Sequence, residues 1–144
     1  MSKENNIINN PAMGCMLGRA YQILLSKLAK ALANANLDIT TSEYLILRAL
    51  YSRPGIQQCE IADMTGKDKA AVSRCVSGLE KKGLVSTELV SHKCLKVHLT
   101  EKALLIQPRI MAVAQLRHDE LAGMTTDEEL AIFASILKRI IENQ

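Results

Sequence analysis

The sequence predicts a mainly α-helical fold with one small β-hairpin. Over most of the 144 residues, apolar side chains recur at intervals of three and four, the spacing of amphipathic helices. Only between Leu84 and Thr100 does the pattern become the alternation typical of strands. No repeat or low-complexity linker divides the chain, so we expect a single domain over residues 1–144.

The composition limits the classes of function. A hydrophobic fraction of 48% can build a core, and 18 Lys and Arg against 15 Asp and Glu leave a net charge of only +3. Affinity for a polyanion therefore depends on where the charges lie. Aromatic residues make up 3%, too few for the stacking platforms of single-strand or RNA binders. A polar N-terminus and the lack of a long uncharged apolar stretch predict a cytoplasmic protein with no membrane partner.

The first helices are predicted from caps and periodicity. One covers about residues 15–35, and the next begins at a capping box of Thr40 and Glu43 and stops at Pro54-Gly55. A short helix then ends at Gly66. Asp68 is expected to cap the following helix, which has an apolar inner face and terminates at Gly83. Two short helices joined by a tight turn indicate a helix-turn-helix.

After Gly83 we expect a hairpin and two more helices. "LVSTEL" and "CLKVHLT" are the predicted strands, joined by "VSHK". Thr100 can cap a long helix, in which Pro108 should cause a bend or a break. A second capping box, Thr125 and Glu128, is predicted to open the last helix. This order of elements is that of a winged helix-turn-helix.

The helix in "KDKAAVSRCVSGLEKKGLV" has an outer face suited to duplex DNA. A helix in the major groove needs short side chains near the base edges, hydroxyls, and cations for guanine or phosphate. The residues on or beside this face are Lys67, Lys69, Ala70, Ser73, Arg74 and Ser77. The alternative is an ordinary solvated helix face.

The hairpin behind this helix is expected to contribute cations. His92 and Lys93 lie in its predicted tip and Lys96 follows, so the tip can reach the minor groove or its phosphates. The alternative is a charged hairpin that only protects its edges from pairing with other strands.

These motifs resemble the multiple antibiotic resistance regulator (MarR) family of bacterial transcription factors. "AAVSRCVSGLEKKGLV" looks like the family's recognition helix and first wing strand, and "VHLTEKA" looks like its second strand and following helix. The resemblance implies a DNA-binding lobe over about 38–99, a helical dimerisation region over about 11–36 and 100–144, and a wing-tip cation at Lys93. Because Ser91-His92-Lys93 replaces the family's Asp-Arg-Arg run, we expect Lys93 to contact phosphate rather than enter the groove.

The predicted function is therefore a homodimeric, sequence-specific double-stranded DNA-binding regulator. It would be a repressor released by a small apolar or anionic effector. Apolar residues on more than one stripe of the terminal helices favour pairing of two chains, which would place two recognition helices on a pseudo-palindromic operator. A larger intramolecular core is the alternative to pairing. A winged-helix module that binds protein without reading DNA is the alternative function.

Effector and redox sites are predicted in the helical region. Met16, Tyr44 and Met111 are candidates for an effector pocket, although a plain core role is the alternative. Cys15 resembles the sensing cysteine of one peroxide-responsive branch of the family, which makes a thiol-based regulator a further alternative. The four single cysteines and three scattered His residues show no metal-ligand or nucleophile motif. We therefore predict no enzyme, no cofactor and no metal site.

Overall fold

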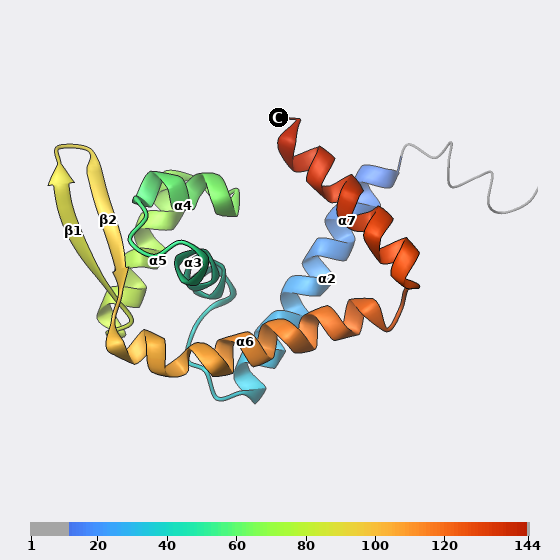
Figure 1. The fold of residues 1–144 in the computed structure, drawn as a ribbon, viewed down its shortest axis with the longest axis horizontal. Coiled ribbons are helices and arrows are strands. Elements are labelled where there is room, and N and C mark those ends of the chain that lie inside the picture. Colours follow the sequence, from blue (N-terminus) through green and yellow to red (C-terminus); the bar gives the residue numbers. More distant parts are fainter. Residues whose placement is uncertain (1–11, 144) are drawn as a thin grey trace, which may run out of the picture.

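The computed structural model describes residues 12–143, which form helices and one antiparallel hairpin. The elements are α2 (Met13–Asn34), α3 (Thr41–Ser52), α4 (Gln58–Thr65), α5 (Lys69–Lys81), β1 (Val85–Ser91), β2 (Cys94–Leu99), α6 (Glu101–Ala122) and α7 (Asp127–Glu142). Figure 1 shows α3, α4, α5 and the hairpin gathered at one end, with α6 running from the hairpin toward α2 and α7. This arrangement confirms the predicted mainly α fold with a wing.

One apolar core joins the winged region to α2 and α6. Leu47 and Leu50 of α3 are fully buried, and they share a cluster with Leu32 of α2, Val76 of α5 and Ile110 of α6. Because the cluster draws on both ends of the chain, the helix-turn-helix does not fold against itself alone. Its orientation relative to α6 is set by packing.

The hairpin is longer than the sequence predicted. β1 continues through Ser91, with an irregular register between Leu89 and Ser91, and only His92 and Lys93 lie outside the strands. The prediction of a four-residue connection, "VSHK", was therefore wrong, because Ser91 still pairs with Cys94. The exposed side chains of Leu89 and Val90 explain the error, since they break the burial alternation that the sequence pattern relied on.

Strand β2 is also tied to the start of α4. The Val97 N–H donates to the Ile56 carbonyl at 3.0 Å, and Gln57 forms an isolated bridge with Lys96. Val97 is fully buried and Ile56 nearly so. The base of the wing is therefore hydrogen-bonded and packed against the helix-turn-helix.

Helix α6 continues through Pro108, so the break considered near Gln107 is absent from this described segment.

Two arginines of α6 hold α2 in place. The Arg117 guanidinium donates to the Leu24 carbonyl at 2.7 Å, and Arg109 donates to the carbonyls of Ala35 and Asn36 just after α2 ends. Among residues 12–143, no helix is both long enough and apolar enough to cross a bilayer.

The last helix begins one residue later than expected. The Thr126 hydroxyl accepts from the Glu129 N–H at 3.2 Å, and the Glu129 carboxylate accepts from the Thr126 N–H at 3.4 Å. The sequence contains two overlapping pairs with this spacing, and the Thr125–Glu128 prediction was wrong because the Thr125 hydroxyl donates to the Leu121 carbonyl in the last turn of α6.

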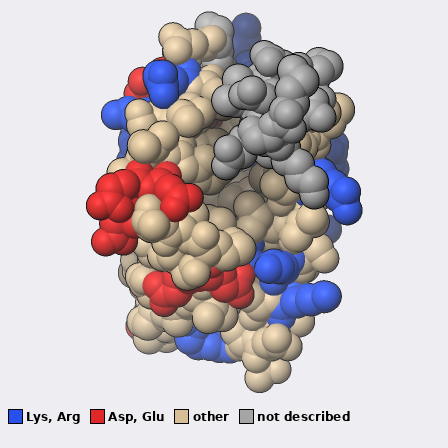
Figure 2. Space-filling view, turned by 90° about the vertical axis from the view of Figure 1, so that its right-hand side faces the viewer, with Lys and Arg blue, Asp and Glu red and all other residues tan. Residues whose placement is uncertain are grey.

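Helix α7 packs little surface within the chain. The structure describes all of its residues, and none is buried. Its apolar side chains Ile132, Ile136, Ile140 and Ile141 are 40–64% exposed. Figure 2, which looks onto this end of the molecule, shows uncharged side chains over much of the centre and acidic ones gathered toward the left. A surface of this kind usually marks an interaction site.

Replacing Tyr51 with Phe tests the link between α3 and α6. The Tyr51 hydroxyl donates to the Ala103 carbonyl at 2.6 Å, so Tyr51→Phe should lower the free energy of unfolding by about 1 kcal/mol. Burial raises the pKa of Tyr51 above its ordinary 10.0, which means that the phenol ionises first in the unfolded chain. Wild-type stability should therefore fall as pH rises above about 10, and that fall should be smaller in Tyr51→Phe.

Urea unfolding followed by circular dichroism, near pH 7 and near pH 11, measures both effects. An equal alkaline loss of stability in the two proteins would contradict the role given to Tyr51.

Candidate nucleic-acid interface

Helix α5 presents one buried and one exposed face. Its N-terminus is capped by the Asp68 carboxylate, which accepts from the Ala71 N–H at 2.7 Å. Val72, Val76 and Leu79 are buried against the core, as the sequence predicted, while Cys75 is half-buried. The predicted outer residues Lys69, Ala70, Ser73, Arg74 and Ser77 are all exposed. The helix is therefore anchored on one side and open to a partner on the other.

The start of α5 lies beside the wing. Lys69 and Lys93 line the same small hollow of about 150 Å³, together with Gln58, Cys59 and Leu95. Two ammonium groups from elements far apart in sequence thus border one depression. This arrangement is suited to an anionic group such as a phosphate, because both cations are available to it.

The remaining wing residues lie in different settings. His92 is exposed at the tip, whereas Lys96 is half-buried in β2 opposite Glu88. The Glu88 carboxylate lies 2.8 Å from His98 Nε2 across the hairpin. Lys96 therefore lies within the paired strands, farther from the tip of the hairpin than Lys93.

Lys67 is already engaged within the fold. Its ammonium donates to the Ser42 hydroxyl at 3.0 Å, which joins the turn before α5 to the first turn of α3. Lys67 is half-buried, unlike the exposed cations of α5. Its position supports the turn, and any contact with a polyanion would compete with this hydrogen bond.

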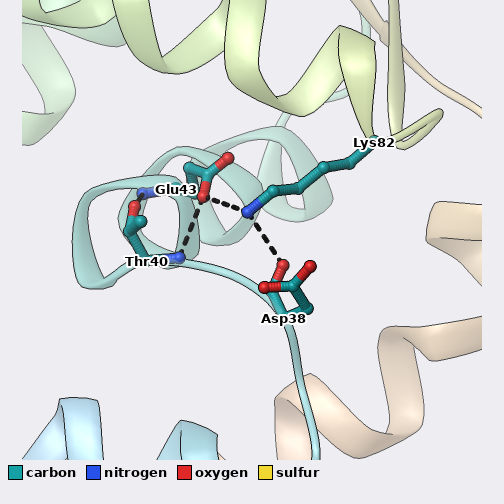
Figure 3. A network of polar contacts seen from close by, with 4 residues as sticks. All are labelled: Asp38, Thr40, Glu43 and Lys82. Atoms are coloured by element: carbon teal, nitrogen blue, oxygen red, sulfur yellow. Dashed lines mark hydrogen bonds and ion pairs between the residues drawn. The ribbon is translucent and has the colours of Figure 1, made fainter.

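A buried carboxylate fixes the other end of α5. Glu43 is 4% exposed, and its Oε1 accepts from the Thr40 N–H at 2.9 Å and from Lys82 Nζ at 2.8 Å. Lys82 Nζ also donates to the Asp38 carbonyl at 2.9 Å (Figure 3). The capping box predicted for α3 is confirmed. Its Glu43 carboxylate also binds Lys82, the C-cap residue of α5.

Gly78 allows this close approach. A Cβ built at Gly78 would lie 3.1 Å from Glu43 Oε2, closer than most Cβ contacts. The inner face of α5 can therefore approach the carboxylate only where it lacks a side chain.

Sequence analysis missed the pairing of Glu43 with Lys82 and the presence of Cys59 in the hollow. Glu43 was interpreted only as a cap and Lys82 only as a terminal charge. The signal available was the combination of a capping glutamate and a glycine four residues before a lysine, which is too common to identify a pair. Cys15 and Cys59 are exposed, and Cys75 is half-buried.

The three predicted effector residues differ in their exposure to solvent. Tyr44 is buried in the core, Met16 is 53% exposed on α2, and the Met111 sulfur accepts from Arg48. None of the three lines the large hollow between α2 and α6. Cys15 is exposed in the first turn of α2. The effector pocket and the redox site remain predictions.

Comparison with known proteins finds a family model that matches the winged region. A sequence model described as "MarR family" matches residues 37–92, which run from the end of the α2–α3 loop to the wing tip. This part of the chain is similar to the MarR family. The match includes the whole of α5 and the buried Glu43, so both faces described above fall within the part that defines the family.

Relatives and solved structures show similarity in sequence and in fold. The HTH-type transcriptional regulator YybA of Bacillus subtilis is 27% identical over 75% of this chain and 73% of its own length. A MarR protein from Peptoclostridium difficile has a TM-score of 0.82 at 20% identity, covering 93% of this chain and 88% of that one. CouR from Rhodococcus jostii, solved bound to p-coumaroyl-CoA, has a TM-score of 0.78 at 22% identity over 90% and 91%. The chain shares the winged helix-turn-helix fold of these solved MarR proteins, and curated relatives such as YybA are described as transcriptional regulators.

Removing the Lys82 ammonium should destabilise the protein. In Lys82→Met the buried Glu43 carboxylate loses its cation, and we expect a loss of about 1.5–3 kcal/mol in the free energy of unfolding. The neighbouring Lys81 is exposed and forms no ion pair within residues 12–143, so Lys81→Met is a matched control expected to change stability little. Urea unfolding measures both, and equal stabilities for the two variants would contradict the pairing.

Proposed function

We propose that this protein is a homodimeric MarR-family repressor that binds a specific duplex DNA sequence and is released from it by a small molecule. The observation that carries the proposal is the exposed face of α5 beside the wing, where Lys69 and Lys93 border one hollow. The domain division follows from it. Residues of about 38–99 would bind DNA, and about 11–36 with 100–144 would form the dimer.

The side chains of α5 suit base and phosphate contacts. Ala70, Ser73 and Ser77 are short enough for the helix backbone to approach base edges, and Ser can donate or accept a hydrogen bond. Arg74 forms no hydrogen bond or ion pair with another described residue, so its guanidinium is available to guanine or phosphate. Lys93 and His92 at the wing tip would contact the adjacent backbone.

Dimerisation is supported by the exposed apolar surface of α7. Its exposed isoleucines continue onto apolar residues of α2 and α6, including Ile23, Leu105 and Leu116. Proteins of the MarR family bind DNA as dimers. Pairing these helices across a two-fold axis would bury the apolar surface and set two α5 helices about one DNA turn apart.

Release by a small molecule is supported by a relative. CouR, whose fold this chain shares, was solved with p-coumaroyl-CoA bound. In this chain the hollow between α2 and α6 is large enough, at about 660 Å³, for a ligand of moderate size.

Arg74→Ala should weaken DNA binding. If the guanidinium contacts a guanine edge, the loss is about 1–3 kcal/mol, or roughly 5- to 150-fold in Kd. The measurement is a gel shift with the DNA upstream of the gene, repeated at increasing salt, because phosphate contacts make affinity fall steeply with salt. Lys138→Ala, at a 74% exposed position of α7 on the side away from Ile136 and Ile140, is the control and should bind as the wild type does.

The same gel shift separates the regulator from a protein-interaction module. A module that does not read DNA would show no salt-dependent shift with any upstream fragment. Equal affinities for Arg74→Ala and Lys138→Ala would contradict the assignment of the α5 face.

A pair of charges on α7 should separate the dimer. Wild-type protein is expected to sediment at about twice the chain mass of 15.9 kDa, and Ile136→Glu with Ile140→Glu at about once that mass, because carboxylates would be buried without partners. Leu89→Glu, at a 72% exposed position on the wing, is the control and should leave the dimer intact. Analytical ultracentrifugation measures the mass, and circular dichroism verifies the helices. A wild type that sediments as a single chain would refute the dimer.

A further inference from the structure

A group of cations lies where α2, α5 and α6 meet. Two adjoining hollows occur there, one of about 660 Å³ between α2 and α6 and one of about 380 Å³ between the α2–α3 loop, the end of α5 and the start of α6. Arg109 lines both hollows. The cations that border them, here called the junction cations, are Lys27, Lys30, Lys81, Lys102 and Arg109.

The junction cations lack carboxylate partners. None of them forms an ion pair within residues 12–143, while Lys82, also in the second hollow, is neutralised by Glu43. The carboxylates that line the hollows are Asp38 and Glu120, and Glu120 already pairs with Arg117 at 3.3 Å. Positive charge at this junction is therefore largely uncompensated, in a chain whose net charge is only +3.

Two of the junction cations have their geometry fixed by the fold. Lys102 Nζ donates to the Lys82 carbonyl at 2.7 Å, and Arg109 Nη2 donates to the carbonyls of Ala35 and Asn36. These bonds hold the side chains without cancelling their charge, because a carbonyl is neutral. Arg109 also keeps its other guanidinium nitrogens for a further acceptor.

The two hollows differ in character. Small and apolar side chains line the first, among them Ala31, Ala112, Val113 and the 53% exposed Leu116. In the second, Lys81, Lys82 and Lys102 stand close to the end of α5. Leu116 and Lys102 are fourteen residues apart on α6, which corresponds to about 21 Å along a helix.

We propose that the two hollows bind one amphipathic anion. Its apolar part lies against Leu116 in the first hollow, Arg109 contacts its middle, and a head with two or more negative charges meets Lys81 and Lys102. The length and the several cations fit an acyl or aryl group joined to a phosphate-bearing carrier better than a simple carboxylic acid. A nucleic acid would gain nothing from the apolar hollow, and the exposed DNA-binding face proposed for α5 begins at the opposite end of that helix.

This site differs from the pocket expected at Met16, Tyr44 and Met111, none of which lines either hollow. It deepens the effector part of the proposed function and rests on that function only for its effect on DNA. The head would contact the point where α5 ends and α6 begins. Binding there would therefore alter the contact between Lys102 and the Lys82 carbonyl, which joins the two helices.

Isothermal titration of the full chain with octanoyl-CoA tests the site without DNA. Octanoate and coenzyme A carry only the tail or only the head, and each is expected to bind at least tenfold more weakly. Lys81→Gln, and separately Lys102→Gln, should each weaken octanoyl-CoA binding up to about fivefold, because both ammonium groups meet the proposed head. Lys138→Gln on α7 is the matched control, since Lys138 is exposed and lines neither hollow.

The outcomes separate this proposal from the proposed function. Binding of octanoyl-CoA that weakens in the junction variants but not in Lys138→Gln would support the site, whether or not the protein shifts DNA. No binding, or binding equal in all variants, would overturn it even if the protein is a DNA-binding repressor. If Lys81→Gln instead weakened binding to a non-operator duplex and left octanoyl-CoA unaffected, the junction would be a nucleic-acid contact and the proposal would be wrong.

Discussion

The buried carboxylate of Glu43 is the contact on which the helix-turn-helix geometry depends. One oxygen accepts both the N–H that begins α3 and the ammonium that follows α5, and the other lies against Gly78. An ionised group this deeply buried is tolerated only when donors surround it, so α3 and α5 are held to a narrow range of relative positions. The exposed face of α5 inherits its orientation from that constraint.

The same constraint extends toward the rest of the chain through α6. Tyr51 at the end of α3 binds the first turn of α6, and Lys102 of that turn binds the carbonyl after α5. Farther along, Arg109 and Arg117 hold α2 by its backbone carbonyls. These side-chain hydrogen bonds join elements that are distant in sequence. A shift of α2 or α6 would therefore be transmitted directly to the winged region.

The sequence was informative wherever a local rule decides the structure. The Thr40 cap, the Asp68 cap and the buried face of α5 follow from spacing alone, and all were confirmed. Overlapping signals caused the error at Thr126, because two pairs have capping-box spacing and the end of α6 decides between them. Contacts between elements distant in sequence, such as Glu43 with Lys82 or Lys69 near Lys93, produce no periodic pattern in the sequence. Helical periodicity could therefore identify the residues involved but not which of them come together.

The backbone bond from β2 to the segment before α4 has a mechanical consequence. With Val97 joined to Ile56 and buried beside it, the hairpin cannot swing about its base without breaking both a hydrogen bond and core packing. The wing tip and the start of α5 are therefore held at a fixed separation. In the proposed complex with DNA, adaptation to a wider or narrower groove would come from the bending of the nucleic acid or from the flexible side chains of Lys69 and Lys93.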